Sequence, residues 1–256
     1  MEISAKVVMD LRAKTGVSMM ACKKALVEAG GDEVKAIEIL RKSGEAKALS
    51  KADRDTTEGV VFADIRGNKG VLVELRCETD FVARNEDFVA TAKAIAEAAH
   101  TGGVAAAEAT ADEAIKAAVV KLGENIQLGG VKMIEGDSLG FYIHANNKTG
   151  AIVAMTSGNE QLGRDLSMQA VAAHPEVVNP EDVDSALVES EMAIEKEKLL
   201  KEGKPEQILE KILEGKVRKF REERAMLTQD FIKDPSKKVR DVLGGATVTG
   251  FVKFAI

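Results

Sequence analysis

Apolar residues recur at helical spacing through the first part of the chain, in three short runs separated by turn signals. Ser4, Ser18 and Asp32 stand where helices would begin, and Gly30-Gly31 would end the second helix. The positions that we expect to face inward are Val7, Val8, Leu11, Cys22, Ala25, Leu26, Val34, Ile37 and Leu40. The pattern predicts an N-terminal three-helix domain over residues 1–54, whose small core is typical of a docking module.

From Gly59 onward the period of the apolar pattern changes from that of a helix to that of a strand. The segment before it, Lys42–Thr57, is poor in large apolar residues and predicts either a linker or an extension of the third helix. Every second residue from Val71 to Cys77 is apolar, and Arg66–Gly70 supplies a hairpin turn. The elements expected next are helices over 85–99 and 111–122, a Gly/Ala loop between them, and a strand over 126–133. Together these elements predict an α+β unit, the core N-subdomain, over 55–140.

The same unit is repeated. A second hairpin is expected over Phe141–Ser157. Gly150 follows Gly70 by 80 residues, and Ser157 follows Cys77 by the same offset of 80. A common offset keeps the strand register, which favours an internal duplication. The later elements expected in this copy are a helix through His174, a second helix over 236–243 and a last strand over 247–254. We therefore expect a core C-subdomain made of residues 141–180 and 229–256.

An insertion separates the two parts of the second copy, over residues 181–228. One helix is expected from Pro180 to about Glu202 and another over 206–224, with Gly203-Lys204-Pro205 as the turn between them. The apolar seam expected between the helices is Leu187, Ile194, Ile208, Leu209, Ile212, Leu213 and Val217. The pattern predicts an antiparallel helical hairpin that projects from the second copy.

Composition limits the class of protein. Lys and Arg number 36 against 42 Asp and Glu, so the net charge is −6 and a nucleic acid is not the expected partner. No apolar run approaches the ~18 residues of a membrane span, and the N-terminus has no secretory pattern, so we expect a cytoplasmic protein with no membrane role. Cys22 and Cys77 are expected to be buried, reduced thiols.

Residues that could carry chemistry are scarce. His100, His144 and His174 stand in no metal-binding spacing and beside no plausible nucleophile, and there is no phosphate-binding loop. We expect no metal, no cofactor and no direct binding of nucleotide, and hence no enzyme. An active site assembled from scattered carboxylates is the remote alternative.

The segment Cys77–Val82 is the most informative, because a strand there turns into a helix at a corner that carries an acid beside an aromatic. Aromatic residues make up only 4% of the chain. At the offset of 80, Thr79-Asp80-Phe81 corresponds to Asn159-Glu160-Gln161, so the second copy makes the bend without an aromatic. This contrast favours an exposed Phe81, although Phe81 as a core residue and Asp80 as a helix N-cap are open alternatives.

Met19 and Met20 form a second unusual pair. Neighbouring side chains on a helix point about 100° apart, so both cannot lie in the small core formed with Cys22 and Leu26. At least one is expected at the surface, in reach of a partner, whereas a loosely packed core Met is the alternative.

Four motifs together resemble the family of bacterial translation elongation factor Ts, the exchange factor of elongation factor Tu. They are Leu11–Leu26, Cys77–Ala83, Gly123–Ile126 and Thr249–Phe251, and they span nearly the whole chain in order. The resemblance implies an N-terminal domain like a ubiquitin-associated (UBA) domain, a core of two related α+β subdomains with small antiparallel sheets, and an antiparallel coiled-coil insertion of dimerisation type. A homodimer and a dimer of heterodimers are both left open.

The resemblance also implies a function and its residues. The protein would bind elongation factor Tu carrying GDP and promote release of GDP and Mg²⁺, so that GTP can rebind. Residues implied at the Mg²⁺ and nucleotide site of the partner are Thr79, Asp80, Phe81 and Val82. Residues implied at its nucleotide-binding domain are Arg12, Met19, Met20 and Lys23, and those at its third domain are Ile126 and His144. For His144, a plain strand-surface histidine is the alternative.

Many members of the family continue past the strand at Phe251–Phe254 into a helical module, and the sequence ends at Ile256, so contacts from such a module are left out. A scaffold protein with an adaptor-like bundle and a dimerising hairpin is the competing hypothesis, but it gives Asp80 and Phe81 no role.

Overall fold

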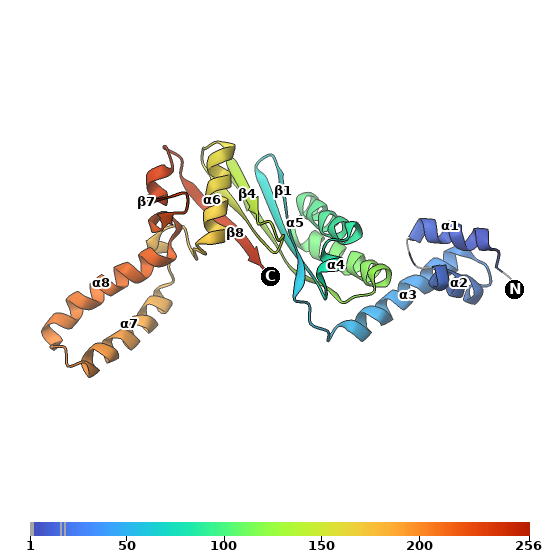
Figure 1. Cartoon of the computed structure of the whole chain (residues 1–256), viewed down its shortest axis with the longest axis horizontal. Helices are drawn as coiled ribbons and strands as arrows, with labels where there is room; N and C mark the ends of the chain where they lie inside the picture. The colour runs from blue at the N-terminus through green and yellow to red at the C-terminus, as the bar shows by residue number, and fades with distance from the viewer. Residues whose placement is uncertain (1–2, 16, 18) are drawn as a thin grey trace.

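The computed structural model describes residues 3–15, 17 and 19–256, with the side chains of 45–50 and 206 left out of the description. The molecule is elongated, with a three-helix bundle at one end, a helical hairpin at the other and a core of two small sheets between them (Figure 1). The fold is α+β with antiparallel sheets, as the sequence predicts.

The N-terminal bundle consists of α1 (Ala5–Thr15), α2 (Met19–Glu28) and α3 (Glu33–Lys51). Asp32 caps α3 through its carboxylate, as expected, while the predicted cap Ser18 lies outside the described residues. The bundle core is Val8, Leu11, Val17, Cys22, Ala25, Leu26, Ala36 and Leu40. Val7 and Val34 were also expected to face inward, but their side chains are 38% and 78% exposed, because Val8 and Leu11 define the inward face of α1 and Ala36 and Leu40 that of α3.

Helix α3 continues far beyond the bundle and contacts the core of the molecule. It runs to Lys51, so most of the segment for which a linker or a helical extension was expected is helix. Gly44 permits this contact, since a Cβ atom there would lie 2.7 Å from Cγ2 of Val120. The bundle is thus held by one long helix rather than by a flexible tether.

The first sheet has the order β1–β2–β3, with β1 (Glu58–Arg66), β2 (Lys69–Cys77) and β3 (Ile126–Glu135) all antiparallel. The one-turn helix α4 (Asp80–Ala83) follows β2, and α5 (Glu86–Leu122) covers the sheet. A Gly/Ala loop was expected inside α5. The two expected helices are present on either side of the non-helical residue Gly103 (φ 77°, ψ −172°), but the break is confined to that residue and the Ala-rich segment after it is helix.

The second sheet repeats the arrangement with β4 (Ser138–Ile143), β5 (Thr149–Met155) and β8 (Val248–Ala255), in the order β4–β5–β8. The helix α6 (Glu160–Ala172) packs on it. A register shift falls between Glu74 and Leu75 in β2, and another between Ala154 and Met155 in β5. The two shifts are again 80 residues apart, so the structure supports the duplication.

The core has four layers, in the order α5, first sheet, second sheet, α6 (Figure 1). The apolar contact between the two sheets is centred on the buried residues Val61, Leu72 and Ile152. A backbone hydrogen bond from Val61 to the carbonyl of Asn147 (2.7 Å) and an ion pair between Lys148 and Glu58 (2.6 Å) join the sheets at one end. The central strands are therefore covered on both faces, which explains their nearly continuous apolar sequences.

The second copy lacks the helix that was expected over 236–243. The 3-10 helix η2 (Met226–Thr228), a short β6–β7 hairpin (Asp230–Phe231 and Asp234–Lys238) and the 3-10 helix η3 (Val239–Val242) occupy this part. In this hairpin Asp230 and Phe231 pair with Lys238 and Asp234, and an ion pair between Lys238 and Asp230 (2.7 Å) joins the two strands. Met226, Phe231 and Val239 fill the core instead.

The insertion forms an antiparallel helical hairpin of α7 (Ser185–Lys201) and α8 (Glu206–Arg224). Asp184 caps α7, so the expected start at Pro180 was too early, and Pro180–Asp182 is the separate 3-10 helix η1. The expected seam was partly wrong: Val188, Leu199 and Leu209 are buried, whereas Leu187, Ile194 and Ile208 are exposed. No helix among the described residues is long and apolar enough to span a membrane.

Candidate functional site

The corner after β2 is built by a capped single turn of helix. Thr79 has an extended backbone and its hydroxyl oxygen accepts a hydrogen bond from the N–H of Val82, so Thr79 is the N-cap of α4. Asp80 is the first helical residue and pairs with Arg84 (2.9 Å), which rules out the alternative of Asp80 as the cap. The negative charge of Asp80 at the first turn also suits the helix dipole.

Phe81 points away from the core at this corner. It is 82% exposed, whereas its neighbours Val82 and Ala83 pack against the core of the first copy. The alternative of Phe81 as a core residue was therefore wrong. An exposed Phe among few aromatics, held on a turn whose other apolar residues are anchored, is the arrangement of a contact residue for a partner.

The residues before the corner are held by the loop at 123–125. The carboxylate of Glu124 accepts hydrogen bonds from the N–H groups of Glu78 (3.1 Å) and Thr79 (3.0 Å), and from the hydroxyl of Thr79 (2.5 Å). The N–H of Asn125 donates to the Glu78 carboxylate (2.6 Å), which lowers the pKa of Glu78, and Arg54 adds to this effect. Sequence reasoning gave Glu124 no role, although the motif Gly123–Ile126 contains it.

Cys77, at the end of β2, offers no reactive thiol. Its Sγ donates to the carbonyl of Thr79 (3.2 Å), and burial raises the thiol pKa to about 12. A thiol with this pKa stays protonated at neutral pH and is a poor nucleophile. Cys77 and Cys22 are both buried and free, in agreement with the expectation of structural thiols.

The residues expected to contact a partner from the bundle lie at the surface. Arg12 on α1 and Lys23 on α2 are exposed, and Met20 is 74% exposed, while Met19 packs partly against the bundle core. The prediction that at least one of the two methionines is exposed is confirmed. Met20 and Lys23 are three residues apart on α2 and share one face of the helix.

Ile126 and His144 differ in exposure. Ile126 opens β3 and is 3% exposed, packed in the core of the first copy, so in this conformation its side chain presents no surface. His144 is exposed where β4 ends, and its Nδ1 is 3.0 Å from the hydroxyl of Tyr142. These contacts place His144 where either a partner contact or an ordinary surface histidine would be found.

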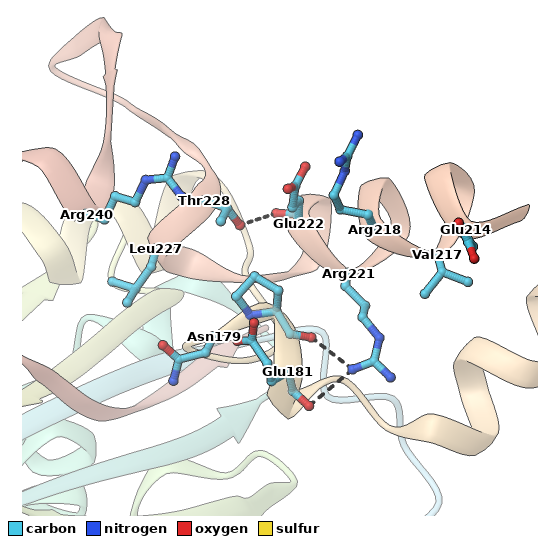
Figure 2. A pocket seen from close by; sticks show the side chains of 11 residues that line it. Asn179, Glu181, Glu214, Val217, Arg218, Arg221, Glu222, Leu227, Thr228 and Arg240 are labelled. Carbon is cyan, nitrogen blue, oxygen red and sulfur yellow. Dashed lines mark hydrogen bonds between the residues drawn. The ribbon is translucent and has the colours of Figure 1, made fainter. Parts of the chain in front are cut away.

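A cleft with a volume of about 680 Å³ lies elsewhere, at the root of the helical hairpin. Its charged lining is balanced and consists of Arg218, Arg221, Arg240, Glu181, Glu214 and Glu222. Figure 2 shows Arg221 pointing to the chain at η1, where it donates to the carbonyls of Pro180 and Glu181 (both 3.2 Å). These hydrogen bonds attach α8 to the second copy at the cleft. Because the positive and negative side chains that line the cleft are equal in number, it favours neither an anionic nor a cationic ligand.

Among the described residues, no group of His, Cys, Asp and Glu side chains is arranged to hold a metal ion. His100 lies beside Asp64 at 3.3 Å, and Nδ1 of His174 is 3.1 Å from Nζ of Lys253. The side chain of His100 is only 7% exposed, whereas His174 lies at the surface. The corner at Thr79–Val82 and the exposed face of α2 are the features that suit binding of a protein partner.

The chain is similar to known proteins of one family over nearly its whole length. The family model described as Elongation factor TS matches residues 78–256. The elongation factor Ts of Actinobacillus succinogenes is 44% identical over 260 residues, which cover 100% of this chain and 91% of that protein. The one from Cronobacter sakazakii is 42% identical over 260 residues, covering 100% and 92%, and that of Aeromonas hydrophila is 41% identical over 266, covering 99% and 90%.

Proposed function

The chain belongs to the elongation factor Ts family of translation elongation factors, and from this premise we propose that it is the guanine nucleotide exchange factor of elongation factor Tu. It binds the partner carrying GDP, promotes release of GDP and Mg²⁺, and leaves the site free for GTP. The observation that carries the proposal is Phe81, 82% exposed beside Asp80 on an anchored corner. The protein acts by binding, in the cytoplasm, without nucleotide, nucleic acid or membrane as a direct ligand.

The energetic mechanism is linkage between two ligands of one partner. A factor that binds the nucleotide-free partner more tightly than the GDP form must weaken GDP by the same factor, about tenfold for each 1.4 kcal/mol of coupling. Burial of one Phe in an apolar pocket supplies roughly 1.5 to 3 kcal/mol, or one to two decades. Loss of Mg²⁺ and of phosphate contacts supplies the rest, because the metal neutralises phosphate charge at such sites.

Asp80 and Phe81 have complementary roles in this proposal. Phe81 enters an apolar pocket beside the nucleotide, and Asp80 brings a negative charge toward the phosphates and their Mg²⁺, which disfavours the bound anion. Thr79 and Val82 hold the pair in place, Thr79 as the helix cap and Val82 by packing against the core. The corner is short and anchored, so little conformational entropy is lost on binding.

The N-terminal bundle supplies a second contact. We assign Arg12, Met19, Met20 and Lys23 to the nucleotide-binding domain of the partner, supported by the exposure of Met20, Arg12 and Lys23. His144 is assigned to its third domain. Ile126, buried here, would act there only through its neighbours or after a rearrangement.

The finer architecture is proposed from the family. The bundle over 1–54 corresponds to a UBA-like domain, 55–140 to the core N-subdomain, 141–180 with 229–256 to the core C-subdomain, and 181–228 to an antiparallel coiled coil of dimerisation type. The exposed Leu187, Ile194 and Ile208 on the hairpin support a role in self-association, as a homodimer or a dimer of heterodimers.

Release of fluorescently labelled GDP from elongation factor Tu, measured by stopped flow across a titration of this protein, tests the proposal. The release rate should rise with concentration and saturate. In a pull-down, excess GDP should displace the partner, because exchange requires that nucleotide and factor compete. Binding that is indifferent to GDP, with an unchanged release rate, would instead establish the scaffold hypothesis.

A further inference from the structure

We propose that Glu124 is a positioning residue, whose carboxylate fixes the orientation in which the Asp80–Phe81 corner is presented to a partner. This inference rests on the proposed function, since it concerns how the same corner is aimed. Glu124 and Thr79 are 45 residues apart in sequence, and β2 ends at Cys77 just before the groups that Glu124 binds. The contact is therefore made by the fold and lies at the exit of the strand.

The geometry of the contact determines the direction in which α4 leaves the sheet. One oxygen of Glu124, Oε2, accepts the consecutive N–H groups of Glu78 and Thr79, which sets the peptide plane between them. The other oxygen, Oε1, accepts the hydroxyl hydrogen of Thr79. With its hydrogen committed to Glu124, the hydroxyl presents its lone pairs to the N–H of Val82 and caps α4. Hydrogen bonds to a carboxylate are stronger than neutral ones, so three of them hold the corner firmly.

The second copy shows that the bend itself does not need this carboxylate. There Asn159 caps α6 with its own side chain, which accepts from the N–H of Leu162 at 2.8 Å. The turn before β8 carries Gly244-Gly245, which have no side chain, near the place where Glu124 and Asn125 precede β3. The equivalent corner of the second copy thus forms without a carboxylate in the place of Glu124. The hydrogen bonds from Glu124 occur in the copy that exposes Phe81, which points to a role in orienting that residue.

The same loop also holds the chain that leaves the N-terminal bundle. The side-chain amide of Asn125, itself buried, donates to the carbonyls of Ala52 (3.3 Å) and Arg54 (2.7 Å), just after α3 ends. Lys51 donates to the carbonyl of Gly123. The loop at 123–125 therefore forms hydrogen bonds both to the corner at 78–79 and to the residues that follow α3. The relative placement of the Met20 face and of Phe81 is set at this loop, through Glu124 for the corner and Asn125 for the bundle.

The test is a double-mutant cycle on GDP release from elongation factor Tu at saturating factor. Alone, Glu124→Ala should slow release by about 10- to 100-fold, with little change in the half-saturating concentration, because misplacing an acting group lowers the maximal rate. In an Asp80→Ala/Phe81→Ala background the same substitution should change the rate by less than about twofold, since both groups that Glu124 aims are gone. Asn159→Ala, which removes the cap of the other corner, is the matched control and should leave release unchanged.

A second measurement needs no partner. Hydrogen exchange of the free protein should be faster at the amides of Glu78 and Thr79 in Glu124→Ala, and unchanged at Val73 and Leu75 in the middle of β2. A loss of protection throughout β2 would show a general structural role and overturn the proposal, as would unchanged exchange at both corner amides.

The outcomes separate the two proposals. If Phe81→Ala alone leaves GDP release unchanged, the corner has no part in exchange, and the positioning role falls with it. If Phe81→Ala slows release while Glu124→Ala does not, or if Glu124→Ala keeps its full effect in the Asp80→Ala/Phe81→Ala background, the exchange mechanism stands and the positioning role of Glu124 is overturned.

Discussion

The two copies of the α+β unit have the same frame and present different residues on it. In each, the middle strand of a three-stranded antiparallel sheet has a register shift, leaves the sheet and enters an N-capped helix, with every step 80 residues apart. At the second position of the helix the first copy exposes Phe81, while the second has Gln161, whose amide donates to Asp165 on its own helix (2.8 Å). The two copies share the strand and helix arrangement because it is set by packing in their cores. They differ at the solvent-exposed position after the cap, where packing places no constraint on the residue.

The copies also differ where helix meets sheet. Gly140 pairs with Val153 in the second sheet, and Phe62 pairs with the corresponding Val73 in the first. A Cβ atom on Gly140 would lie 2.1 Å from the backbone carbon of Gly163 on α6, so the second copy brings helix and strand into backbone contact. In the first copy Phe62 packs against the core at that point. One fold thus tolerates two different spacings between its layers.

The largest effect should come from removing the feature that the copies do not share. Phe81→Ala should slow GDP release at saturating factor by about 10- to 100-fold, because roughly 1.5 to 3 kcal/mol of Phe burial in the partner is lost. The free energy of unfolding should change by less than about 0.5 kcal/mol, since the side chain is exposed. Stopped-flow release and urea denaturation measure the two quantities. Gln161→Ala is the control at the equivalent position, and an equal slowing there would contradict the comparison.

Gly140→Ala tests the close contact that only the second copy has. The added methyl group would meet the backbone of Gly163, so α6 must move away from β4, at a cost of about 1 to 3 kcal/mol in the free energy of unfolding. Chemical denaturation measures the loss. Gly215→Ala serves as a control on α8, where a Cβ atom meets nothing within 4 Å, and it should be neutral or stabilising by up to about 1 kcal/mol. Equal stability of the two variants would show that the layers can separate freely.

Asn159→Ala compares the caps of the two corners. Loss of the Asn159 side chain should lower the free energy of unfolding by about 1 kcal/mol, because the N–H of Leu162 loses its acceptor at the start of the 13-residue helix α6. GDP release should stay at the wild-type rate, in contrast to Phe81→Ala. Denaturant titration and stopped flow on the same preparation give both numbers, and a slowed release would assign the second corner a part in exchange.

The smallest expected effect concerns the insertion, which only the second copy carries. Ion pairs with Lys198 (2.6 Å) and Lys216 (2.7 Å) lower the pKa of Glu195 to about 2. A carboxyl with a lowered pKa stabilises the folded state above its ordinary pKa of 4.5, and this contribution is lost as the pH falls toward about 2. Thermal unfolding at neutral pH and at pH about 3 should differ less in Glu195→Gln than in the wild type. Glu197→Gln, at an exposed position of the same helix, is the control and should keep the wild-type pH dependence.

Much of the fold could be predicted because its signals are local. Alternation over Val71–Cys77 and the turn at Arg66–Gly70 correspond to β2 and its hairpin, and the offset of 80 placed the second copy in register. Prediction failed where the length of a break or the pairing of two segments decides the structure. The helical break at Gly103 is one residue long where a loop was expected, and 234–238 pairs with Asp230-Phe231 as a hairpin where a helix was expected.

The candidate site divides in the same way. The sequence alone determined that Phe81 is dispensable for the bend, because the duplicated corner carries Gln161 there, and it identified the family through four motifs. Only the tertiary structure decided that Thr79 rather than Asp80 caps α4, that Ile126 is buried, and that Glu124 binds the corner. The physical reason is how far apart in sequence the interacting groups lie. Periodicity and capping involve residues a few positions apart, whereas Glu124 and Thr79 are 45 residues apart and meet only once the sheet has formed.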